Sequence, residues 1–484
     1  MNQPFCLFLL CMSLSLPLVA QPMMDLSTAQ ALARSESPAA RQAALEALSA
    51  QQDYDAFVAS LKPQVRLSAD LPGFSRSING VLQDDGSTIF RSQNQTNARA
   101  SLSLSQALPF TGGQVSLFSS LFNFNQFGPD GFTSWQSVPV GFSYTQPLFQ
   151  PNRYRWDQRE QEATLALAEV QALRQREEAA LAVTRAYLRA WLAQAQTQQA
   201  RQRLAQNDSI YQIAQARHRL GKVSEEQLLQ SELALLQARS ARQEQQLAYQ
   251  QAFAQLLTLL DLPPDGDWQL RTPPPLPPLG STPEAAASLA LQHADLQAAQ
   301  RLDSLRAERE LIETRQATRF QADLTASVGF NQSGNSLGEA YQQLEDQQAF
   351  SLGLNLPLLQ WGQGRAQLEA AQARRESLQI GQEQARRAYG DEIRYRVQQY
   401  ALLQDQLDLA QQAVEVAQRR YRFSRARFEL GKLPLTELLL AQNEQLQAQQ
   451  AYWQLLQQLH LAQTELRTET LYDFIQQKPV NSEQ

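Results

Sequence analysis

Two uninterrupted helical segments constrain this sequence more than any other feature. Residues 152–220 and 362–430 are rich in Ala, Gln, Leu, Arg and Glu and contain no proline. At 1.5 Å per residue, each segment predicts a helix about 100 Å long. No ordinary globular domain holds a helix of that length. The apolar residues form narrow Leu/Ala stripes that are typical of a coiled-coil seam, and the other faces are polar.

The chain is a duplication. The Leu-Gly-Lys sequence around Gly221 returns around Gly431, 210 residues later, and Pro147 and Pro357 are separated by the same interval. Further upstream, residues 65–67 match a segment 255 residues later, so the first copy holds about 45 extra residues. We therefore expect two tandem structural repeats per chain.

Before each long helical segment the hydrophobic period changes from 3.6 to 2. Residues 65–71 and 138–144 alternate between apolar and polar in the first copy, and residues 320–328 and 350–356 do so in the second. Such segments suit tilted membrane strands with apolar-out and polar-in faces, although a soluble sheet on a core has the same alternation. The extra residues of the first copy predict one more hairpin at 98–124.

The segments between these strands lack the alternation of apolar and polar residues. Residues 73–97 and 125–137 are polar or glycine-rich, which predicts loops. Each copy also contains two shorter predicted helices. The helix that opens each copy has an expected N-cap: Ser27 for 26–59 and Thr282 for 282–318. The helices that follow the long segments are expected at 224–260 and 434–474. Two short helices end to end match the length of one long helix.

These features divide the chain into segments. Residues 1–20 predict a signal peptide, and residues 21–260 form the first repeat with its helical tip at 220–224. A proline-rich linker at 261–281 predicts a stiff, extended segment that runs as a strap along the outside of these helices. The second repeat covers 282–475 with its tip at 430–434, and 476–484 is expected to be a disordered tail.

Several functional classes are excluded. Both cysteines, Cys6 and Cys11, lie in the predicted signal peptide, so the mature chain has no disulfide and no thiol chemistry. The net charge of −6 does not favour nucleic-acid binding. No metal-ligand spacing, phosphate loop or catalytic serine motif stands out, so we expect no cofactor, no metal and no enzymatic activity.

The sequence resembles the TolC family of outer-membrane efflux proteins over about residues 25–475. The residues that carry the resemblance are the twin tips, Arg217 to Gly221 and Arg427 to Gly431, and the strand exits around Pro147 and Pro357. The resemblance implies an α+β membrane protein: a long antiparallel α-helical barrel joined to a transmembrane β-barrel, with three chains sharing one barrel. Four strands cannot close a barrel alone, whereas three chains supply twelve, or eighteen if the extra hairpin joins.

The family resemblance also implies site residues and partners. The hairpin tips would dock on a periplasmic adaptor that links the channel to an inner-membrane pump of RND or ABC type. The docking residues carried over are Arg217, Leu220, Gly221, Ser224, Arg427, Leu430, Gly431 and Thr436. Glu437 is a candidate for an acidic ring at the entrance, although a solvated glutamate at a helix end is an equally good interpretation. The tip glycines also have a purely structural role as helix ends.

The predicted function is an exit duct for small toxic compounds, with its strands in outer-membrane lipid and a large part in the periplasm. A duct for type I protein secretion is an alternative that the sequence leaves open. A periplasmic coiled-coil structural protein without a channel is the alternative from another class.

Overall fold

The computed structural model describes residues 23–128, 131–263, 268–293 and 295–480. The expected signal peptide at 1–20 therefore lies outside the described residues. Contacts within the chain divide it into two compact units. Unit 1 comprises Met1–Ala43, Arg174–Ala290 and Ile393–Gln484, and unit 2 comprises Ala44–Leu173 and Leu291–Glu392.

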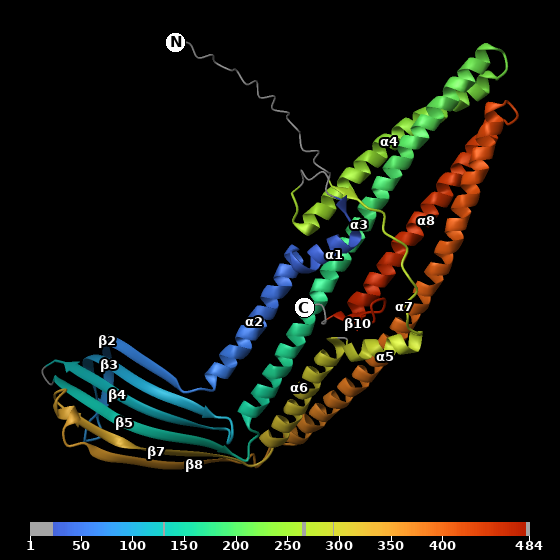
Figure 1. Ribbon diagram of the computed structural model, residues 1–484. Helices are drawn as coiled ribbons and strands as arrows, with labels where there is room; N and C mark the ends of the chain where they lie inside the picture. The colour runs from blue at the N-terminus through green and yellow to red at the C-terminus, as the bar shows by residue number, and fades with distance from the viewer. Residues whose placement is uncertain (1–22, 129–130, 264–267, 294, 481–484) are drawn as a thin grey trace, which may run out of the picture. The chain divides into compact units, whose positions relative to one another are not determined.

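The two long helices are confirmed almost to the residue (Figure 1). Helix α3 covers Arg153–Arg219 and helix α7 covers Gln363–Glu429, with 67 residues in each. After the tips, α4 covers Glu225–Leu260 and α8 covers Leu435–Thr470. Helices α7 and α8 begin and end 210 residues after α3 and α4, respectively. The duplication seen in the sequence is therefore a duplication of structure.

The opening helix of the first copy is broken, whereas the sequence predicted one helix over 26–59. Helix α1 covers Leu26–Ser35 and helix α2 covers Pro38–Ser60. Proline has no N–H and disfavours helical geometry in the residue before it, so the helix is interrupted at Ser37. The Ser37 hydroxyl then accepts the N–H of Ala40 at 3.1 Å and caps α2.

The N-cap of α1 is Asp25 and not Ser27, as the sequence had predicted. The Asp25 carboxylate accepts the N–H of Thr28 at 2.7 Å, and Ser27 donates its hydroxyl to the same carboxylate at 3.0 Å. The hydrogen bonds from Thr28 hold the pKa of the Asp25 carboxyl below its usual value. An aspartate is preferred here because its charge also interacts favourably with the helix N-terminus.

The opening helix of the second copy, expected over 282–318, is also divided. Helix α5 covers Pro283–His293 and helix α6 covers Asp295–Ala317, while residue 294 lies outside the described residues. The predicted N-cap is confirmed, because the Thr282 hydroxyl accepts the N–H of Ala285 at 3.3 Å.

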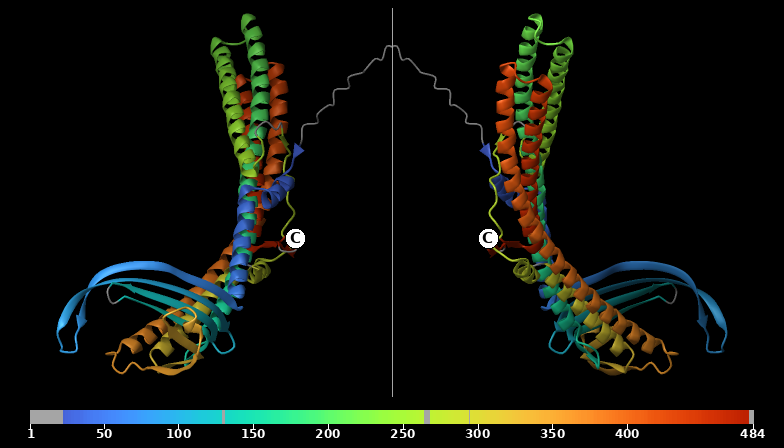
Figure 2. Two further views of the ribbon diagram at one scale, coloured as in Figure 1. Left: turned by 90° about the vertical axis from the view of Figure 1, so that its left-hand side faces the viewer. Right: turned by 90° about the vertical axis from the view of Figure 1, so that its right-hand side faces the viewer.

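Six antiparallel strands of unit 2 form one curved sheet (Figure 2). Their order is β2-β3-β4-β5-β7-β8. The strands are β2 (Gln64–Leu82), β3 (Thr88–Leu108), β4 (Gly113–Phe127), β5 (Phe132–Leu148), β7 (Gln321–Gly334) and β8 (Glu345–Asn355). The first copy thus supplies four strands and the second copy two.

The extra hairpin of the first copy is longer than predicted and lies inside the sheet. The expected hairpin at 98–124 is the pair β3–β4, which is hydrogen-bonded between β2 and β5. The segments 73–97 and 125–137, expected to be loops, mostly continue these strands. Their polar side chains were misleading, because the backbone ladder of a strand does not depend on the polarity of its side chains.

The two faces of the sheet differ in polarity. One row across the strands runs Val65↔Leu104↔Leu117↔Phe142↔Val328, and the adjacent row on the opposite face runs Ser105↔Ser116↔Ser143↔Ser327. The apolar face is open to its surroundings. Its exposed members include Val65, Leu67, Leu102, Leu104, Leu117, Val140, Phe142, Val328, Phe330, Phe350, Leu352 and Leu354. Apolar and polar faces of this kind fit a strand that meets lipid on one side only.

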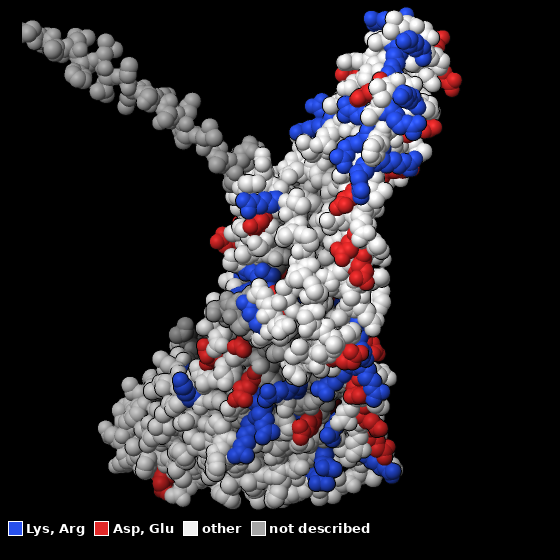
Figure 3. Space-filling model, turned by 45° about the vertical axis from the view of Figure 1, so that its right-hand side comes forward, with Lys and Arg blue, Asp and Glu red and all other residues white. Residues whose placement is uncertain are grey.

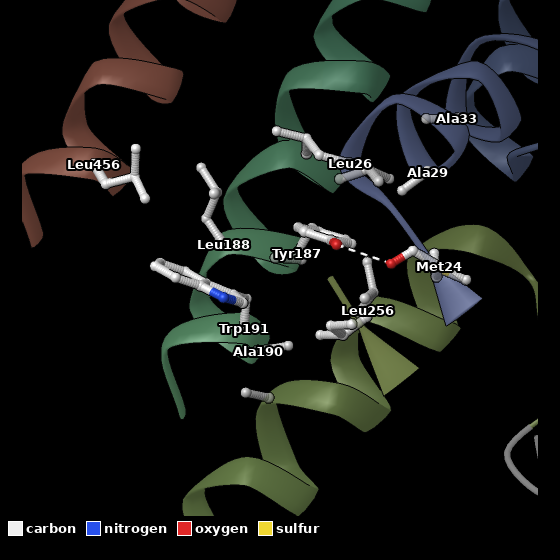
Figure 4. Close-up of a cluster of buried hydrophobic side chains, with 14 of the residues drawn as sticks. Met24, Leu26, Ala29, Ala33, Tyr187, Leu188, Ala190, Trp191, Leu256 and Leu456 are labelled. Atoms are coloured by element: carbon white, nitrogen blue, oxygen red, sulfur yellow. Dashed lines mark hydrogen bonds between the residues drawn. The ribbon is translucent and has the colours of Figure 1, made fainter. Parts of the chain in front are cut away.

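The main core lies in unit 1, where α1, α3, α4 and α8 contribute buried side chains (Figure 4). Tyr187, Leu188 and Trp191 of α3 are at most 2% exposed. The Tyr187 hydroxyl lies 2.9 Å from the carbonyl oxygen of Met24 and 2.8 Å from that of Arg271. Burial raises the pKa of the Tyr187 hydroxyl above its ordinary value, so the hydroxyl stays a donor at a pH where an exposed tyrosine would ionise.

The proline-rich linker contributes a strap that crosses unit 1. We define the strap as residues 268–279, since 264–267 lie outside the described residues. Strand β6 (Gln269–Leu270) pairs in parallel with β1 (Met23–Met24). The strap's carbonyl groups are then bound by helix side chains: Tyr400 donates to Pro277 at 2.8 Å and Gln404 to Leu276 at 3.1 Å. An extended proline-rich backbone has no internal hydrogen bonds, so its carbonyls are available for such contacts.

The C-terminal segment is more ordered than the sequence predicted. Helix α8 ends at Thr470, four residues before the expected end, and Leu471 adopts a left-handed conformation with φ of 50°. Strand β9 (Tyr472–Asp473) then pairs with β10 (Lys478–Pro479). The expected disordered tail at 476–484 is therefore wrong up to residue 480, and residues 481–484 lie outside the described residues.

Hydrogen bonds fix the order of the four helices in unit 1. Asn207 of α3 donates to the carbonyl of Ala234 in α4 at 3.0 Å. Arg185 of α3 pairs with Glu465 of α8 at 2.7 Å, and the same glutamate accepts from Arg396 of α7 at 3.2 Å. Helices α3 and α8 therefore lie in the middle, and α4 and α7 are the two outer helices.

Candidate functional site

The two helical tips have the same backbone geometry. After α3, the N–H of Lys222 bonds to the carbonyl of Arg217 at 2.9 Å, and the N–H of Gly221 bonds to that of His218 at 2.9 Å. The second tip repeats both bonds at the same positions: Lys432 to Arg427 and Gly431 to Phe428, both at 2.9 Å. This pair of bonds is the Schellman motif, which ends a helix with a left-handed residue.

The tip glycines are required by their backbone conformation. Gly221 has φ of 68° and Gly431 has φ of 73°, a region that costs any residue with a Cβ atom about 1–2 kcal/mol. A Cβ atom at either position would meet nothing within 4 Å, so the requirement is conformational and not steric crowding. Their structural role is therefore established, and a role in docking is an addition to it.

The following helices begin differently in the two copies. Ser224 caps α4, because its hydroxyl accepts the N–H of Gln227 at 3.3 Å. The corresponding residue of α8, Pro434, has no side-chain cap. Thr436 is exposed in the first turn of α8. Ser224 is thus occupied in helix capping, while the side chain of Thr436 forms no hydrogen bond with another described residue.

Two leucines are the most exposed large apolar residues of the tips. Leu220 is 71% exposed and Leu430 is 70% exposed. Beneath them a small core holds the tips together, formed by Ile210, Tyr421, Phe428, Leu433, Leu435 and Leu438. Exposed leucines on a firmly packed support are suited to contact with another protein.

Arg217 and Arg427 occupy equivalent sequence positions but have different surroundings. The Arg217 guanidinium donates to the carbonyl oxygens of Phe428 at 3.0 Å and Glu429 at 2.8 Å, and it lies 5.3 Å from the Phe428 ring centroid. Arg427 is exposed, and its side chain forms no hydrogen bond or ion pair with another described residue. Arg217 therefore joins the first tip to the second, whereas Arg427 is available to a partner. Nothing in the sequence distinguished the two.

Glu437, the candidate for the entrance, lies in the first turn of α8. It is exposed and forms no ion pair with any residue in the described part of the chain. The positive end of the α8 dipole favours a carboxylate at this position, so the local structure alone accounts for it. Its counterpart in the first copy is Gln227, which is partly buried.

A buried ion cluster in unit 1 was not predicted from the sequence. The Glu177 carboxylate, 1% exposed, receives the Arg34 guanidinium at 2.7 and 3.0 Å and the Nε of Arg467 at 3.1 Å. Arg467 also pairs with Asp473. We call these four residues the buried ion cluster. No sequence signal reveals it, because its members come from α1, α3, α8 and β9.

The described residues contain no group of three metal-binding side chains. Among them there is also no helix that combines the length and the apolar character needed to cross a membrane.

The chain matches the family model of the outer membrane efflux protein over residues 30–261 and 286–470. No curated protein matches its sequence. Solved structures are similar in fold. CusC shares 18% identity, with 92% of this chain and 91% of that chain covered and a TM-score of 0.66. VceC from Vibrio cholerae shares 16% identity, with 93% and 95% covered and a TM-score of 0.64. CmeC from Campylobacter jejuni shares 16%, with 92% and 85% covered and a TM-score of 0.67.

These proteins are channels and not enzymes, and members of the family are trimers that work with adaptors and inner-membrane pumps. The alternative of a structural coiled coil without a channel is therefore rejected. The fold class expected from the sequence, long helices in two repeats joined to a β domain, is confirmed. The chain belongs to the outer membrane efflux protein family, whose members are located in the bacterial outer membrane with a large helical part in the periplasm.

Proposed function

We propose that this chain forms a homotrimeric exit duct that carries small toxic compounds from the periplasm to the outside. We further propose that its tips dock on a periplasmic adaptor, which couples the duct to an inner-membrane pump of the RND or ABC type. The observation that carries the proposal is an apolar stripe left uncovered on α7.

The stripe follows an unbroken seven-residue spacing. It consists of Tyr395, Leu402, Leu409, Val416 and Phe423, each between 55% and 72% exposed. An apolar residue at every seventh position is the pattern of a coiled-coil seam, which a partner helix normally covers. The stripe is on an outer helix of unit 1, and its side chains remain exposed among the described residues.

The other outer helix offers a matching surface. On α4, Leu229, Leu233, Leu236 and Leu247 are each more than 50% exposed, with intervals of 4, 3 and 11 residues that fit the same heptad pattern. A contact between α7 of one copy and α4 of the next is heterologous, and repeating it generates a ring. This supports a closed assembly of identical chains.

The sheet supports the same assembly. Its edge strands β2 and β8 each leave one row of N–H and C=O groups unpaired, and such edges readily accept another strand. Because each chain contributes an even number of antiparallel strands, pairing β8 of one copy with β2 of the next preserves the alternation. Closing the ring would remove both edges and leave the apolar face toward lipid.

The trimer is tested by replacing Leu409 at the centre of the stripe with glutamate. Three charges buried in the seams of the ring should prevent assembly, so Leu409→Glu is expected to yield monomers, as measured by native mass spectrometry in detergent. Gln411→Glu is the matched control, because Gln411 is exposed on the same helix but is outside the stripe. Intact trimers of Leu409→Glu would contradict the proposed seam.

The duct itself is tested by recording from the purified trimer in a planar bilayer. Discrete steps of ionic current are expected, and a silent membrane would contradict the proposal. Transport of a small toxic compound, and not of a polypeptide, is tested by the sensitivity of the host cell after deletion of the gene.

We also propose that three copies of Glu437 form a cation-favouring ring at the entrance. The exposed and unpaired carboxylate supports this, because a ring of acidic side chains attracts cations. Glu437→Gln is expected to reduce the cation selectivity of the channel, measured as the reversal potential in a salt gradient. Glu226→Gln, which removes an exposed first-turn glutamate from α4, is the control. Equal reversal potentials for Glu437→Gln and the wild type would reject the ring.

A further inference from the structure

Cations without anionic partners gather on the first helical hairpin. Residues 201–242 contain seven Lys and Arg against four Asp and Glu. None of the seven cations forms an ion pair with a carboxylate of a described residue, whereas Arg153, Arg174 and Arg185, which precede them on α3, each pair with an aspartate or a glutamate. Figure 3 shows Lys and Arg side chains gathered over the ends of the helices that carry the tips. The unpaired charge makes this region attractive to an anionic partner.

Three of these arginines surround one hollow. Arg201 of α3 and Arg239 and Arg242 of α4 line a hollow of about 380 Å³, together with Leu204, Ala205 and Asp208. We call it the arginine hollow. Arg201 donates to the Gln246 side chain at 3.0 Å, and Asp208 accepts from Gln212 at 2.9 Å. Among the described residues, the three guanidinium groups therefore have no other hydrogen-bond acceptor, and most of their donors are available.

The duplication indicates that the scaffold does not need these arginines. The second copy has the same pair of helices 210 residues later. At the positions that correspond to Arg201, Arg239 and Arg242 it has Gln411, Gln449 and Tyr452. The second pair of helices therefore forms without arginines at these positions. The arginine hollow is a feature of the first hairpin alone, and the helical fold does not require it.

The heptad pattern of α3 gives the direction of the hollow. Tyr187, Gln194 and Arg201 follow at intervals of seven and therefore lie along the same face of the helix. Tyr187 contacts the carbonyl of Arg271, and Gln194 donates to that of Leu270 at 3.0 Å, so this face is the one that the strap covers. A strap across the bore of a duct would obstruct it. The strap face, and with it the arginine hollow, is thus on the outer surface.

We infer that the arginine hollow is a second docking surface for the periplasmic adaptor, and that it binds a helix bearing carboxylates. The inference rests on the proposed duct and goes beyond its tips. The guanidinium group of an arginine suits a carboxylate because it can donate two parallel hydrogen bonds to the two carboxylate oxygens. Leu204 and Ala205 add an apolar floor between two antiparallel helices, where the side chains of a third helix fit.

The test uses the purified full-length trimer and a labelled helical peptide of about 20 residues, long enough to be helical alone. The peptide carries glutamates and a leucine along one face, and a second peptide has glutamine in place of each glutamate. The wild type is expected to bind the glutamate peptide at low salt and to lose it as salt rises. The variant Arg239→Gln/Arg242→Gln should bind about ten-fold more weakly.

The control variant is Arg419→Gln/Arg422→Gln, which removes two exposed arginines of the second hairpin that form no ion pair with another described residue. This variant loses the same total charge as Arg239→Gln/Arg242→Gln, but its arginines are outside the arginine hollow. It should therefore bind the glutamate peptide as the wild type does. Equal weakening of both variants, or equal binding of both peptides, would overturn the inference.

Bilayer recordings separate this inference from the proposed function. If the wild-type trimer conducts and Arg239→Gln/Arg242→Gln leaves the reversal potential unchanged, the arginines are outside the conduit, as inferred. A shifted reversal potential with unchanged peptide binding would place them in the conduit and overturn the docking surface. A wild-type trimer that does not conduct would refute the duct and leave the peptide result to stand by itself.

Discussion

Replacing Glu177 with glutamine is expected to lower the free energy of unfolding of unit 1 by about 3–5 kcal/mol, the usual cost of breaking a buried ion pair. Glutamine keeps the shape of the side chain but removes its charge. The guanidinium groups of Arg34 and Arg467 would then face a neutral amide, and Asp473 would remain as a carboxylate paired with Arg467. Little solvent reaches this site, since Arg467 is 6% exposed and Asp473 is 3% exposed.

The loss should appear as a large drop in the unfolding temperature of the purified protein, followed by circular dichroism. Glu369→Gln is the control, because Glu369 also pairs with an arginine, Arg365, but both side chains are more than 60% exposed. An exposed pair of this kind contributes at most about 0.5 kcal/mol, so the control should unfold near the wild-type temperature. Similar temperatures for Glu177→Gln and Glu369→Gln would show that the buried ion cluster does not stabilise the fold.

The buried ion cluster also shows where sequence reasoning ended. The long helices were predicted to within a residue, because helical periodicity without proline is a local property. The tip glycines were predicted for the same reason, since the turn that ends a helix is recorded in adjacent residues. Glu177 and Arg467 are 290 residues apart. Their pairing depends on how helices pack, which no short-range pattern records.

The errors have local physical causes. The helix breaks before Pro38 because proline disfavours helical geometry in the preceding residue. The amphipathic pattern continues across this position, so it predicted a single helix. In the sheet, strands β2 and β3 continue through polar residues to the pair Leu82↔Thr88, because hydrogen bonds between backbones hold them together. The hydrophobic pattern marks only the part of each strand that has an apolar face, so it gave strands that were too short.

The docking residues were transferred by resemblance, and the structure divides them. Leu220 and Leu430 are exposed enough to meet a partner. Ser224 is engaged in a helix cap, and Arg217 is bound to the other tip. A motif that occurs twice in a sequence can therefore carry two roles, because each copy meets different neighbours in the folded chain.

Arg217→Ala is expected to separate the two tips. Its guanidinium binds the last carbonyls of α7, which carry the negative end of that helix's dipole, and it stacks on Phe428. Hydrogen bonds to a charged group contribute about 1.5–3 kcal/mol, and partial exposure reduces the value here. A loss of about 1.4 kcal/mol would shift the balance between joined and separated tips ten-fold.

The separation can be measured without reference to channel activity. Leu220→Cys and Leu430→Cys introduce labelling sites at exposed positions of the two tips, and spin labels there report the distance between them. A wider distance distribution is expected for Arg217→Ala. In bilayers, the same variant should open about ten times more often, if parting of the tips is the opening motion.

Arg427→Ala is the natural control, because it removes the equivalent arginine of the second copy, which is exposed and forms no contact across the tips within the described residues. It should leave the distance distribution and the opening frequency unchanged. Arg217→Lys should be intermediate, since an ammonium group cannot donate in the fixed fork that reaches both Phe428 and Glu429. If Arg217→Ala and Arg427→Ala changed the distance distribution and the opening frequency equally, the bond between Arg217 and the second tip would not be what controls the separation of the tips. The two arginines would then be equivalent in function as they are in sequence.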